Sequence, residues 1–144
     1  FFTVYGPWGR PDMAPMKFTK AILAGEAIDV YNHGDMRRDF TYIDDIVAGV
    51  LATLALPPSG AVPHRVFNIG NNQPEALMHF IEVLQQAIGR KAVCNMLPMQ
   101  AGDVHATAAD VDALRAATGW RPTTGIDKGL PRMVAWYREY FGAV

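Results

Sequence analysis

The chain has 144 residues, half of them apolar and 19% charged, so it can fold around a single hydrophobic core. Its 13 basic and 14 acidic side chains give a net charge of -1, which excludes a global positive field for recruiting nucleic acid or an anionic membrane. The single cysteine, Cys94, excludes an intrachain disulfide and a thiolate metal cluster and favours a reducing cytoplasm.

The first predicted element is a strand at the very start of the chain. Residues 1–5 are apolar and β-prone, and Gly6 followed by Pro7 ends the run. Neither an initiator Met nor a signal peptide precedes this strand. Because a domain rarely begins inside a strand, we expect the chain to be a piece of a longer protein whose other part lies upstream.

A helix and a second strand are predicted next. Asp12 is expected to cap a helix that runs from about Met13 and ends at Gly25. Residues 28–31 read as a short strand, and residues 32–35 as a turn. In the segment that follows, residues 36–45, alternating apolar residues indicate a strand that leads directly into a helix N-terminus.

The helix that begins near Asp44, which is expected to cap it, has an apolar stripe. Its members recur at helical spacing and are predicted to face the core: Val47, Val50, Leu51 and Leu54, with Ile46 widening the stripe. A proline-rich loop ends this helix, and it also interrupts the longest uncharged run, residues 46–63, so that run is too short to span a bilayer. Residues 65–69 are predicted to form a strand.

The second half of the chain contains three further helices. The strongest pattern is an amphipathic helix from Pro74 to Gly89. A short strand at residues 92–96, a short helix at residues 110–117 with Trp120 plugging the core beside it, and a final helix at residues 127–141 follow. Residues predicted to face inward from the final helix are Leu130, Met133, Val134, Tyr137 and Phe141. The alternation indicates an α/β fold in one region, residues 1–144, with too few strands for a complete doubly wound sheet.

Arg37 and Arg38 stand where a strand meets a helix N-terminus, which is a favourable place for an anion. A guanidinium group grips a phosphate with two parallel hydrogen bonds, so the pair predicts an anion site. The alternative is a pair of solvated surface arginines. Nucleic-acid binding is a weaker interpretation, because no basic stripe accompanies the two arginines.

Several common chemistries lack their motifs in this sequence. The glycine fingerprint of a dinucleotide site is absent, because Gly6 and Gly9 are followed by Asp12 rather than by a third glycine. No phosphate-binding P-loop is present, and the four histidines are scattered without ligand spacing, so no metal site is expected. Adjacent aspartates at positions 44 and 45 face different directions on a helix and make a poor acid/base pair.

Five segments, in uninterrupted order, resemble the C-terminal part of NAD-dependent nucleotide-sugar epimerases. They are FFTVYGPWGRPDM (residues 1–13), IDVY (28–31), RRDFTYIDDI (37–46), FNIGN (67–71) and GDV (102–104). These enzymes are extended short-chain dehydrogenases, and the greatest similarity is to UDP-glucuronate 4-epimerases. The resemblance implies the incomplete C-terminal portion of a Rossmann-type enzyme, mostly its small substrate-binding subdomain, with the NAD-binding region outside the chain.

The resemblance also assigns roles to residues. Thr3 and Arg10 are similar to groups that hold the sugar, with Arg10 pairing to a C6 carboxylate. Arg38 resembles the diphosphate arginine, and Asp103 the acceptor for a ribose hydroxyl. The remaining assignments are the uracil-reading strand Asp29, Val30 and Tyr31, a phosphate contact at Lys17, a position that is arginine in some relatives at Gln100, and the nicotinamide end of the cofactor at Phe1 and Phe2.

The family's reaction uses tightly bound NAD and a Tyr with a Lys four residues later as the base. None of the five tyrosines here has such a lysine, so no catalytic residue is expected in this chain, which should be inactive alone and hold no NAD tightly. The expected partners are a UDP-sugar and the N-terminal NAD-binding half, and apolar faces that lack this half should be exposed or covered by another chain.

Three alternatives stay open. One is another UDP- or dTDP-sugar epimerase, the second is a 4,6-dehydratase or decarboxylase of the same family, and the third is a stand-alone nucleotide-sugar binding module without catalysis.

Overall fold

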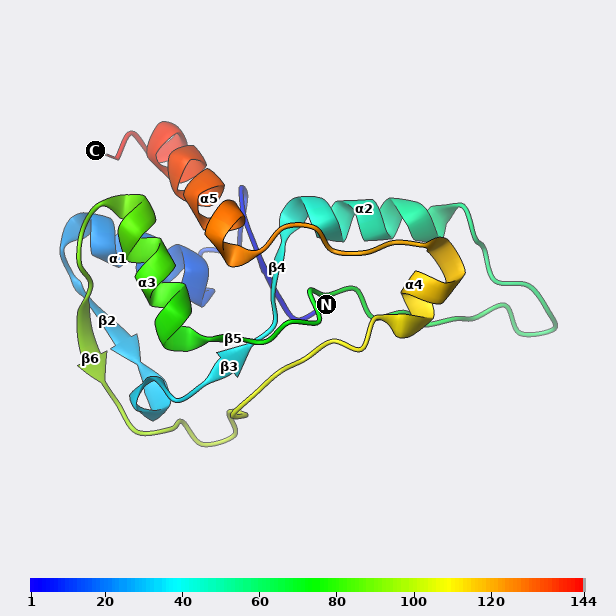
Figure 1. Ribbon diagram of the computed structural model, residues 1–144, viewed down its shortest axis with the longest axis horizontal. Coiled ribbons are helices and arrows are strands. Elements are labelled where there is room, and N and C mark those ends of the chain that lie inside the picture. The colour runs from blue at the N-terminus through cyan, green and yellow to red at the C-terminus, as the bar shows by residue number, and fades with distance from the viewer. Residues whose placement is uncertain (144) are drawn as a thin grey trace.

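The computed structural model describes residues 1–143 and is an α/β structure, as predicted (Figure 1). The first half contains β1 (Thr3–Tyr5), α1 (Ala14–Ala24), β2 (Ala27–Val30), the 3-10 turn η1 (Tyr31–Gly34), β3 (Arg37–Arg38), β4 (Phe40–Tyr42) and α2 (Ile43–Leu54). The second half contains β5 (Glu75–Ala76), α3 (Leu77–Ile88), β6 (Val93–Met96), α4 (Asp112–Thr118) and α5 (Ile126–Phe141).

The strands form three two-stranded sheets rather than one large sheet. β1 pairs with β4 in parallel, with Thr3 opposite Phe40, and β2 pairs with β6 in parallel. β3 pairs with β5 antiparallel, with Arg38 opposite Glu75. Parallel pairs need a crossover connection, and α1 and the segments after it supply these connections. With two strands each, the sheets are too small for a doubly wound fold, as the sequence predicts.

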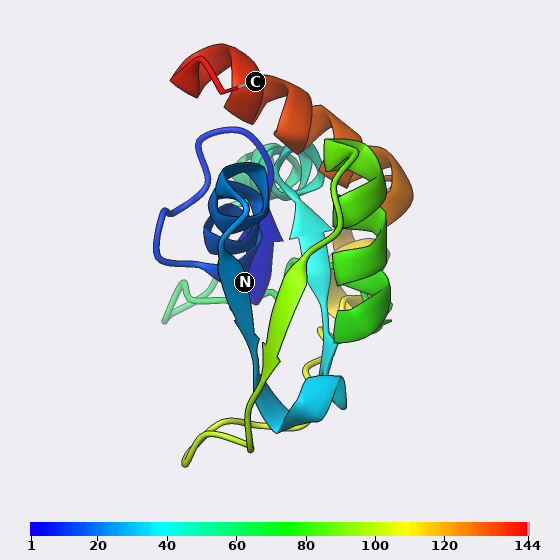
Figure 2. The ribbon, with the colours of Figure 1, turned by 90° about the vertical axis from the view of Figure 1, so that its left-hand side faces the viewer.

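Most of the core lies where α1, α3 and α5 surround β1, β2 and β4 (Figure 2). The ring of Phe40 stacks on Phe80 of α3 with centroids 4.2 Å apart, and Tyr5 meets the edge of Phe40 at 6.5 Å. Gly129 allows α5 to approach β1, because an added Cβ there would collide with the Tyr5 hydroxyl. Strand and helix are thus fixed together by aromatic packing.

Two predicted helix caps are wrong. The N-cap of α1 is Met13, with no side-chain cap, because the Asp12 carboxylate pairs with Arg10 instead. The N-cap of α2 is Tyr42, the last residue of β4, so Asp44 already lies inside the first helical turn. There its negative charge interacts favourably with the positive end of the helix dipole, although it caps no backbone N–H. The predicted end of α1 at Gly25 is confirmed by its left-handed backbone, φ 76°.

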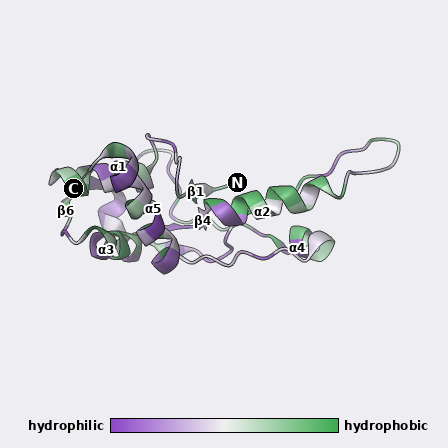
Figure 3. Cartoon of the chain, turned by 90° about the horizontal axis from the view of Figure 1, so that it is seen from above, coloured by the Kyte–Doolittle hydropathy of each residue, from purple (hydrophilic) through white to green (hydrophobic). Residues whose placement is uncertain are grey.

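The predicted inward stripe of α2 is also wrong, except at Ile46. Leu51 and Leu54 are 60% and 71% exposed, whereas Ile46 and Gly49 face the second, smaller core. The helix extends away from the main body, and its apolar residues are visible in Figure 3. Helical periodicity identified an apolar face correctly, but the described residues supply nothing to cover it.

Three smaller differences concern the rest of the chain. Residues 65–69 form no strand, because β-prone residues need a neighbouring ladder and none of the described residues provides one here. Phe141 is 53% exposed rather than buried, at the end of α5. In the α3 region, Glu75 and Ala76 form a short strand, and the helix begins only at Leu77.

Trp120 packs in the second core, as predicted, and it is joined there to a buried acid, Asp45, for which the sequence predicts no structural role. The Trp120 indole N–H donates to the Asp45 carbonyl at 3.1 Å. The Asp45 carboxylate accepts hydrogen bonds from Thr123 and from the Thr124 backbone N–H at 2.9 Å. These bonds fasten the segment between α4 and α5 to the start of α2.

None of the helices within residues 1–143 is both long enough and apolar enough to cross a membrane.

Candidate functional site

One pocket, of about 220 Å³, gathers residues from distant parts of the sequence. Its apolar wall includes Phe18, Phe40 and Leu77. Five of the residues predicted to bind the substrate line it: Thr3, Asp29, Tyr31, Arg38 and Asp103. They come from β1, from β2 and the turn after it, from β3, and from the loop after β6. An apolar cavity with a few convergent polar groups is the usual form of a small-molecule site.

Arg38 is held in a fixed position at this pocket. Its guanidinium donates to the Asp103 carboxylate at 2.8 Å and to the His105 carbonyl at 3.1 Å. The arginine side chain is 16% exposed and the aspartate 33%, so the pair is partly shielded from water. Such a guanidinium has lost much of its conformational freedom before any ligand arrives, which favours binding of an anion.

Arg37 has a different environment, although it is adjacent in sequence. It is exposed, and its guanidinium donates to the Pro74 carbonyl at 2.7 Å. Successive side chains of a strand point to opposite faces, so Arg37 and Arg38 are directed apart. Only Arg38 lines the pocket.

Asp39 is a buried acid beside Arg38 that the sequence analysis did not single out. Its side chain is fully buried, and the carboxylate accepts backbone hydrogen bonds from Asn71 at 2.8 Å, Asn72 at 3.0 Å and Ala109 at 2.8 Å. The Asp39 backbone N–H donates to Thr107 at 3.1 Å. Asp39 therefore ties two loops to the strand that continues from Arg38.

The sequence does contain a signal for Asp39. Alternation along β4 places Phe40 and Tyr42 on one face, which leaves Asp39 and Thr41 on the other. Both faces are buried, because the loops near residues 71 and 109 cover the second one.

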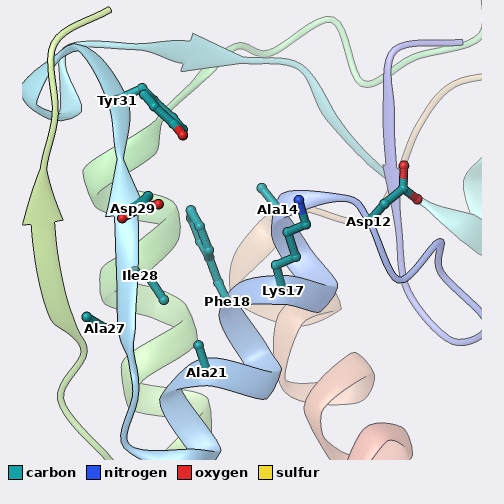
Figure 4. Close-up of a pocket in the computed structure, with 9 residues that line it drawn as sticks. All are labelled: Asp12, Ala14, Lys17, Phe18, Ala21, Ala27, Ile28, Asp29 and Tyr31. Atoms are coloured by element: carbon teal, nitrogen blue, oxygen red, sulfur yellow. The ribbon is translucent and has the colours of Figure 1, made fainter. Parts of the chain in front are cut away.

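A second pocket, of about 390 Å³, adjoins the first and shares Asp29 and Tyr31 with it. Figure 4 shows Lys17 on α1 across from Asp29 on β2, with Phe18 between them. Within the described chain β2 pairs only with β6, so the backbone groups on the other edge of β2 take part in no strand ladder. A planar base can use such groups as donors and acceptors.

Arg10 lies in a third region, around a pocket of about 350 Å³ that Phe1 and Phe2 also line. Met13 lines both this pocket and the 220 Å³ pocket that contains Arg38, which we call the Arg38 pocket, so the two regions are neighbours. The Arg10 Nε donates to Asp12 at 3.1 Å, and this contact lowers the pKa of the Asp12 carboxyl. Both side chains are exposed.

Two predicted residues line none of these three pockets. The Val30 side chain is fully buried in the core, and its carbonyl accepts a hydrogen bond from the Leu97 N–H at 2.9 Å. Gln100 is exposed, and its carbonyl accepts from the Asp103 N–H at 3.2 Å, so it shapes the turn that carries Asp103.

Comparison with known proteins identifies the family. The model of the NAD dependent epimerase/dehydratase family matches residues 1–70. A probable UDP-glucuronate 4-epimerase from Rhizobium meliloti is 47% identical over 98% of this chain and 46% of its own length. The chain belongs to the NAD dependent epimerase/dehydratase family.

Other relatives of the chain agree. UDP-glucuronate 4-epimerase 1 from Arabidopsis thaliana is 43% identical over 99% of the chain and 36% of its own length. The structure of a Bacillus cereus UDP-glucuronic acid 4-epimerase in complex with UDP-glucuronic acid and NAD is 32% identical, with a TM-score of 0.85 over 96% of this chain and 44% of that one. The chain thus spans less than half the length of these relatives.

Three buried or partly buried tyrosines of the chain are poorly suited to act as bases. Burial raises the pKa of Tyr5, Tyr42 and Tyr137, so their hydroxyls stay protonated at neutral pH. A catalytic base needs a pKa near the working pH.

Within the described part of the chain, no three histidine, cysteine or acidic side chains gather closely enough to hold a metal ion.

Proposed function

We propose that this chain is the nucleotide-sugar binding part of an NAD-dependent epimerase that interconverts UDP-glucuronate and UDP-galacturonate at C4. The observation that carries the proposal is the pocket that brings Thr3, Asp29, Tyr31, Arg38 and Asp103 together from four segments of the chain. The B. cereus structure, which is a complex with UDP-glucuronic acid and NAD, supports the substrate class.

The proposed substrate runs across the neighbouring pockets. Its uracil lies against the free edge of β2, with Tyr31 near the ring, and its ribose hydroxyls donate to Asp103. Its diphosphate accepts hydrogen bonds from the Arg38 guanidinium and faces Lys17. The sugar then lies toward Thr3 and Arg10, where a C6 carboxylate takes over part of the pairing that Arg10 now makes with Asp12.

NAD does not fit the glycines of this chain. The chemistry that NAD supplies when bound is removal of a hydride from the sugar C4 and its return to the other face. An added Cβ at Gly6 would meet Ile43, and one at Gly9 would meet Met16, so both glycines serve internal packing rather than an open pyrophosphate site. We therefore place the cofactor-binding region and the catalytic base outside residues 1–144, with Phe1 and Phe2 near the nicotinamide end.

The exposed face of α2 supports this division. Leu51 and Leu54 project from it, and a hollow of about 290 Å³ lined by Phe1, Val50 and Phe67 continues the apolar surface. A contiguous apolar surface of this kind marks an interface. We propose that the NAD-binding region covers it.

A substitution on α2 tests whether the NAD-binding region packs on its exposed face. In the protein expressed from the complete gene, Leu54→Gln should lower the free energy of unfolding by about 1 to 2 kcal/mol, because apolar area leaves an interface. The matched control is Gln86→Leu on α3, an exposed position whose change should alter stability by less than about 0.5 kcal/mol. Denaturant unfolding measures both, and an equally small effect of Leu54→Gln would mean that the α2 face stays exposed.

The proposed reaction is tested by product analysis. The protein expressed from the complete gene, incubated with UDP-glucuronate and NAD, should yield UDP-galacturonate, and the reverse reaction should reach the same mixture. A decarboxylase would release carbon dioxide and a UDP-pentose, and a dehydratase would release water. Binding of UDP-glucuronate without any product would favour a non-catalytic module.

A further inference from the structure

The loop between β1 and α1 carries Arg10, and Trp8 attaches this loop to α5. Trp8 lies 5.3 Å from the ring of Trp136 and 4.8 Å from that of Tyr140, centroid to centroid. Trp136 and Tyr140 stack on each other at 5.4 Å with an interplanar angle of 17°. Figure 2 shows this loop running beside α5. We call these three side chains the aromatic clamp.

The backbone of Trp8 indicates that the clamp is a specific arrangement. Its φ is 63°, in the left-handed region that residues other than glycine adopt infrequently and at a cost. A turn in which the Gly9 N–H donates to the Gly6 carbonyl at 3.2 Å holds the same conformation. Packing of the indole on α5 offsets the cost and fixes where the next residues lie.

The clamp adds little to the core. Trp8 remains 72% exposed and is not a member of either hydrophobic core. Trp136 is only partly buried and packs against the edge of the main core, where the ring of its neighbour Tyr137 lies 6.4 Å away. Helix α5 is itself tied to α3, because the Arg138 guanidinium donates to the Ile88 carbonyl at 2.8 Å. The loop is thus fastened to a rigid helix through an exposed side chain.

Arg10 depends on this attachment for its position. Trp8 and Arg10 line the same pocket, and Gly9 is the only residue between them. Among residues 1–143, the Arg10 side chain forms hydrogen bonds only with Asp12 of the same loop, which moves with it. The link from Arg10 to the body of the protein therefore runs through Trp8 and through the start of α1, where the Met13 N–H donates to the Arg10 carbonyl at 3.2 Å.

We propose that Trp8 is a positioning residue for Arg10, and that the aromatic clamp sets the selectivity of the protein for a nucleotide-sugar with a carboxylate at C6. The inference rests on the proposed function, because it concerns the same sugar pocket. Trp8 itself does not touch the carboxylate. It holds the loop so that the guanidinium of Arg10 meets that group with little loss of freedom on binding.

The test compares binding of UDP-glucuronate, UDP-glucose and UDP by calorimetry, using protein expressed from the complete gene. Trp8→Ala should weaken the binding of UDP-glucuronate about tenfold, which corresponds to the loss of one to two aromatic contacts. The affinities for UDP and UDP-glucose should stay nearly unchanged. Trp8→Phe should restore most of the uronate affinity. After Arg10→Ala, the further change Trp8→Ala should add little, since the two residues act through one contact.

Two adjacent positions on α5 provide the matched control. Tyr140 and Phe141 are 55% and 53% exposed; of these two, only Tyr140 forms an aromatic pair with Trp8, whereas Phe141 packs on Trp136 and Tyr140. Tyr140→Ala should reduce the preference for the uronate, and Phe141→Ala should not. Retention of the full preference in Trp8→Ala, or an equal loss for all three ligands, would overturn the positioning role. A wild-type protein without any preference for UDP-glucuronate would instead overturn the proposed substrate.

Discussion

Arg38→Ala should weaken binding of UDP about 100-fold while leaving uridine binding nearly unchanged. Among the described residues, this arginine is the one cation that lines the pocket, and its guanidinium is already oriented by Asp103 and the His105 carbonyl. A diphosphate would gain charge-assisted hydrogen bonds from a group that needs no further ordering. Calorimetry with UDP and uridine separates the diphosphate contribution from that of the base and ribose.

The neighbouring arginine provides the control for this experiment. Arg37→Ala removes the same charge from the adjacent position, but its side chain is directed to the Pro74 carbonyl and not into the pocket. It should change UDP affinity by no more than about threefold, through long-range attraction alone. Arg38→Lys should give an intermediate affinity, since it keeps the charge but loses the planar fork. Equal losses for Arg37→Ala and Arg38→Ala would point to a diffuse electrostatic effect and against a specific diphosphate contact.

The separation of Arg37 from Arg38 shows what local sequence patterns can and cannot establish. Strand alternation already directs the two side chains to opposite faces, so a difference between them follows from the sequence. Which of them faces a pocket depends on the loop that brings Asp103 to β3, 65 residues later in the chain. No local pattern encodes that approach, and only the resemblance to a known family assigned the diphosphate to Arg38.

The amphipathic helices show the same division. The apolar faces of α3 and most of α5 pack inward as predicted, because strands and other helices of the described chain cover them. The α2 pattern is equally clear, yet Leu51 and Leu54 are exposed. Periodicity reports that a face is apolar, but what covers the face is a property of the assembled protein. The wrong prediction for α2 therefore points to an interface.

The largest stability effect is expected at Asp39, and the decisive substitution is Asp39→Asn. Asn71 and Thr41 donate to one carboxylate oxygen, and the backbone N–H groups of Asn72 and Ala109 donate to the other. Each oxygen therefore accepts two hydrogen bonds. An asparagine of the same shape has two possible orientations. In one, its NH₂ group faces the backbone N–H groups of Asn72 and Ala109, and in the other it faces the Asn71 N–H and the Thr41 hydroxyl.

Asp39→Asn should consequently lower the free energy of unfolding by about 2 to 4 kcal/mol, because in either orientation at least one buried backbone N–H loses its acceptor and faces the new NH₂ group in a fully buried site. Asp44→Asn, an exposed change of the same atoms in the first turn of α2, should cost less than about 0.5 kcal/mol. Denaturant unfolding of the protein expressed from the complete gene measures both. A small effect at Asp39 would mean that the loops at residues 71 and 109 are held by packing alone. If the effect is large, the carboxylate beside Arg38 is what joins those loops to β4, and UDP affinity in folded Asp39→Asn protein should fall together with stability.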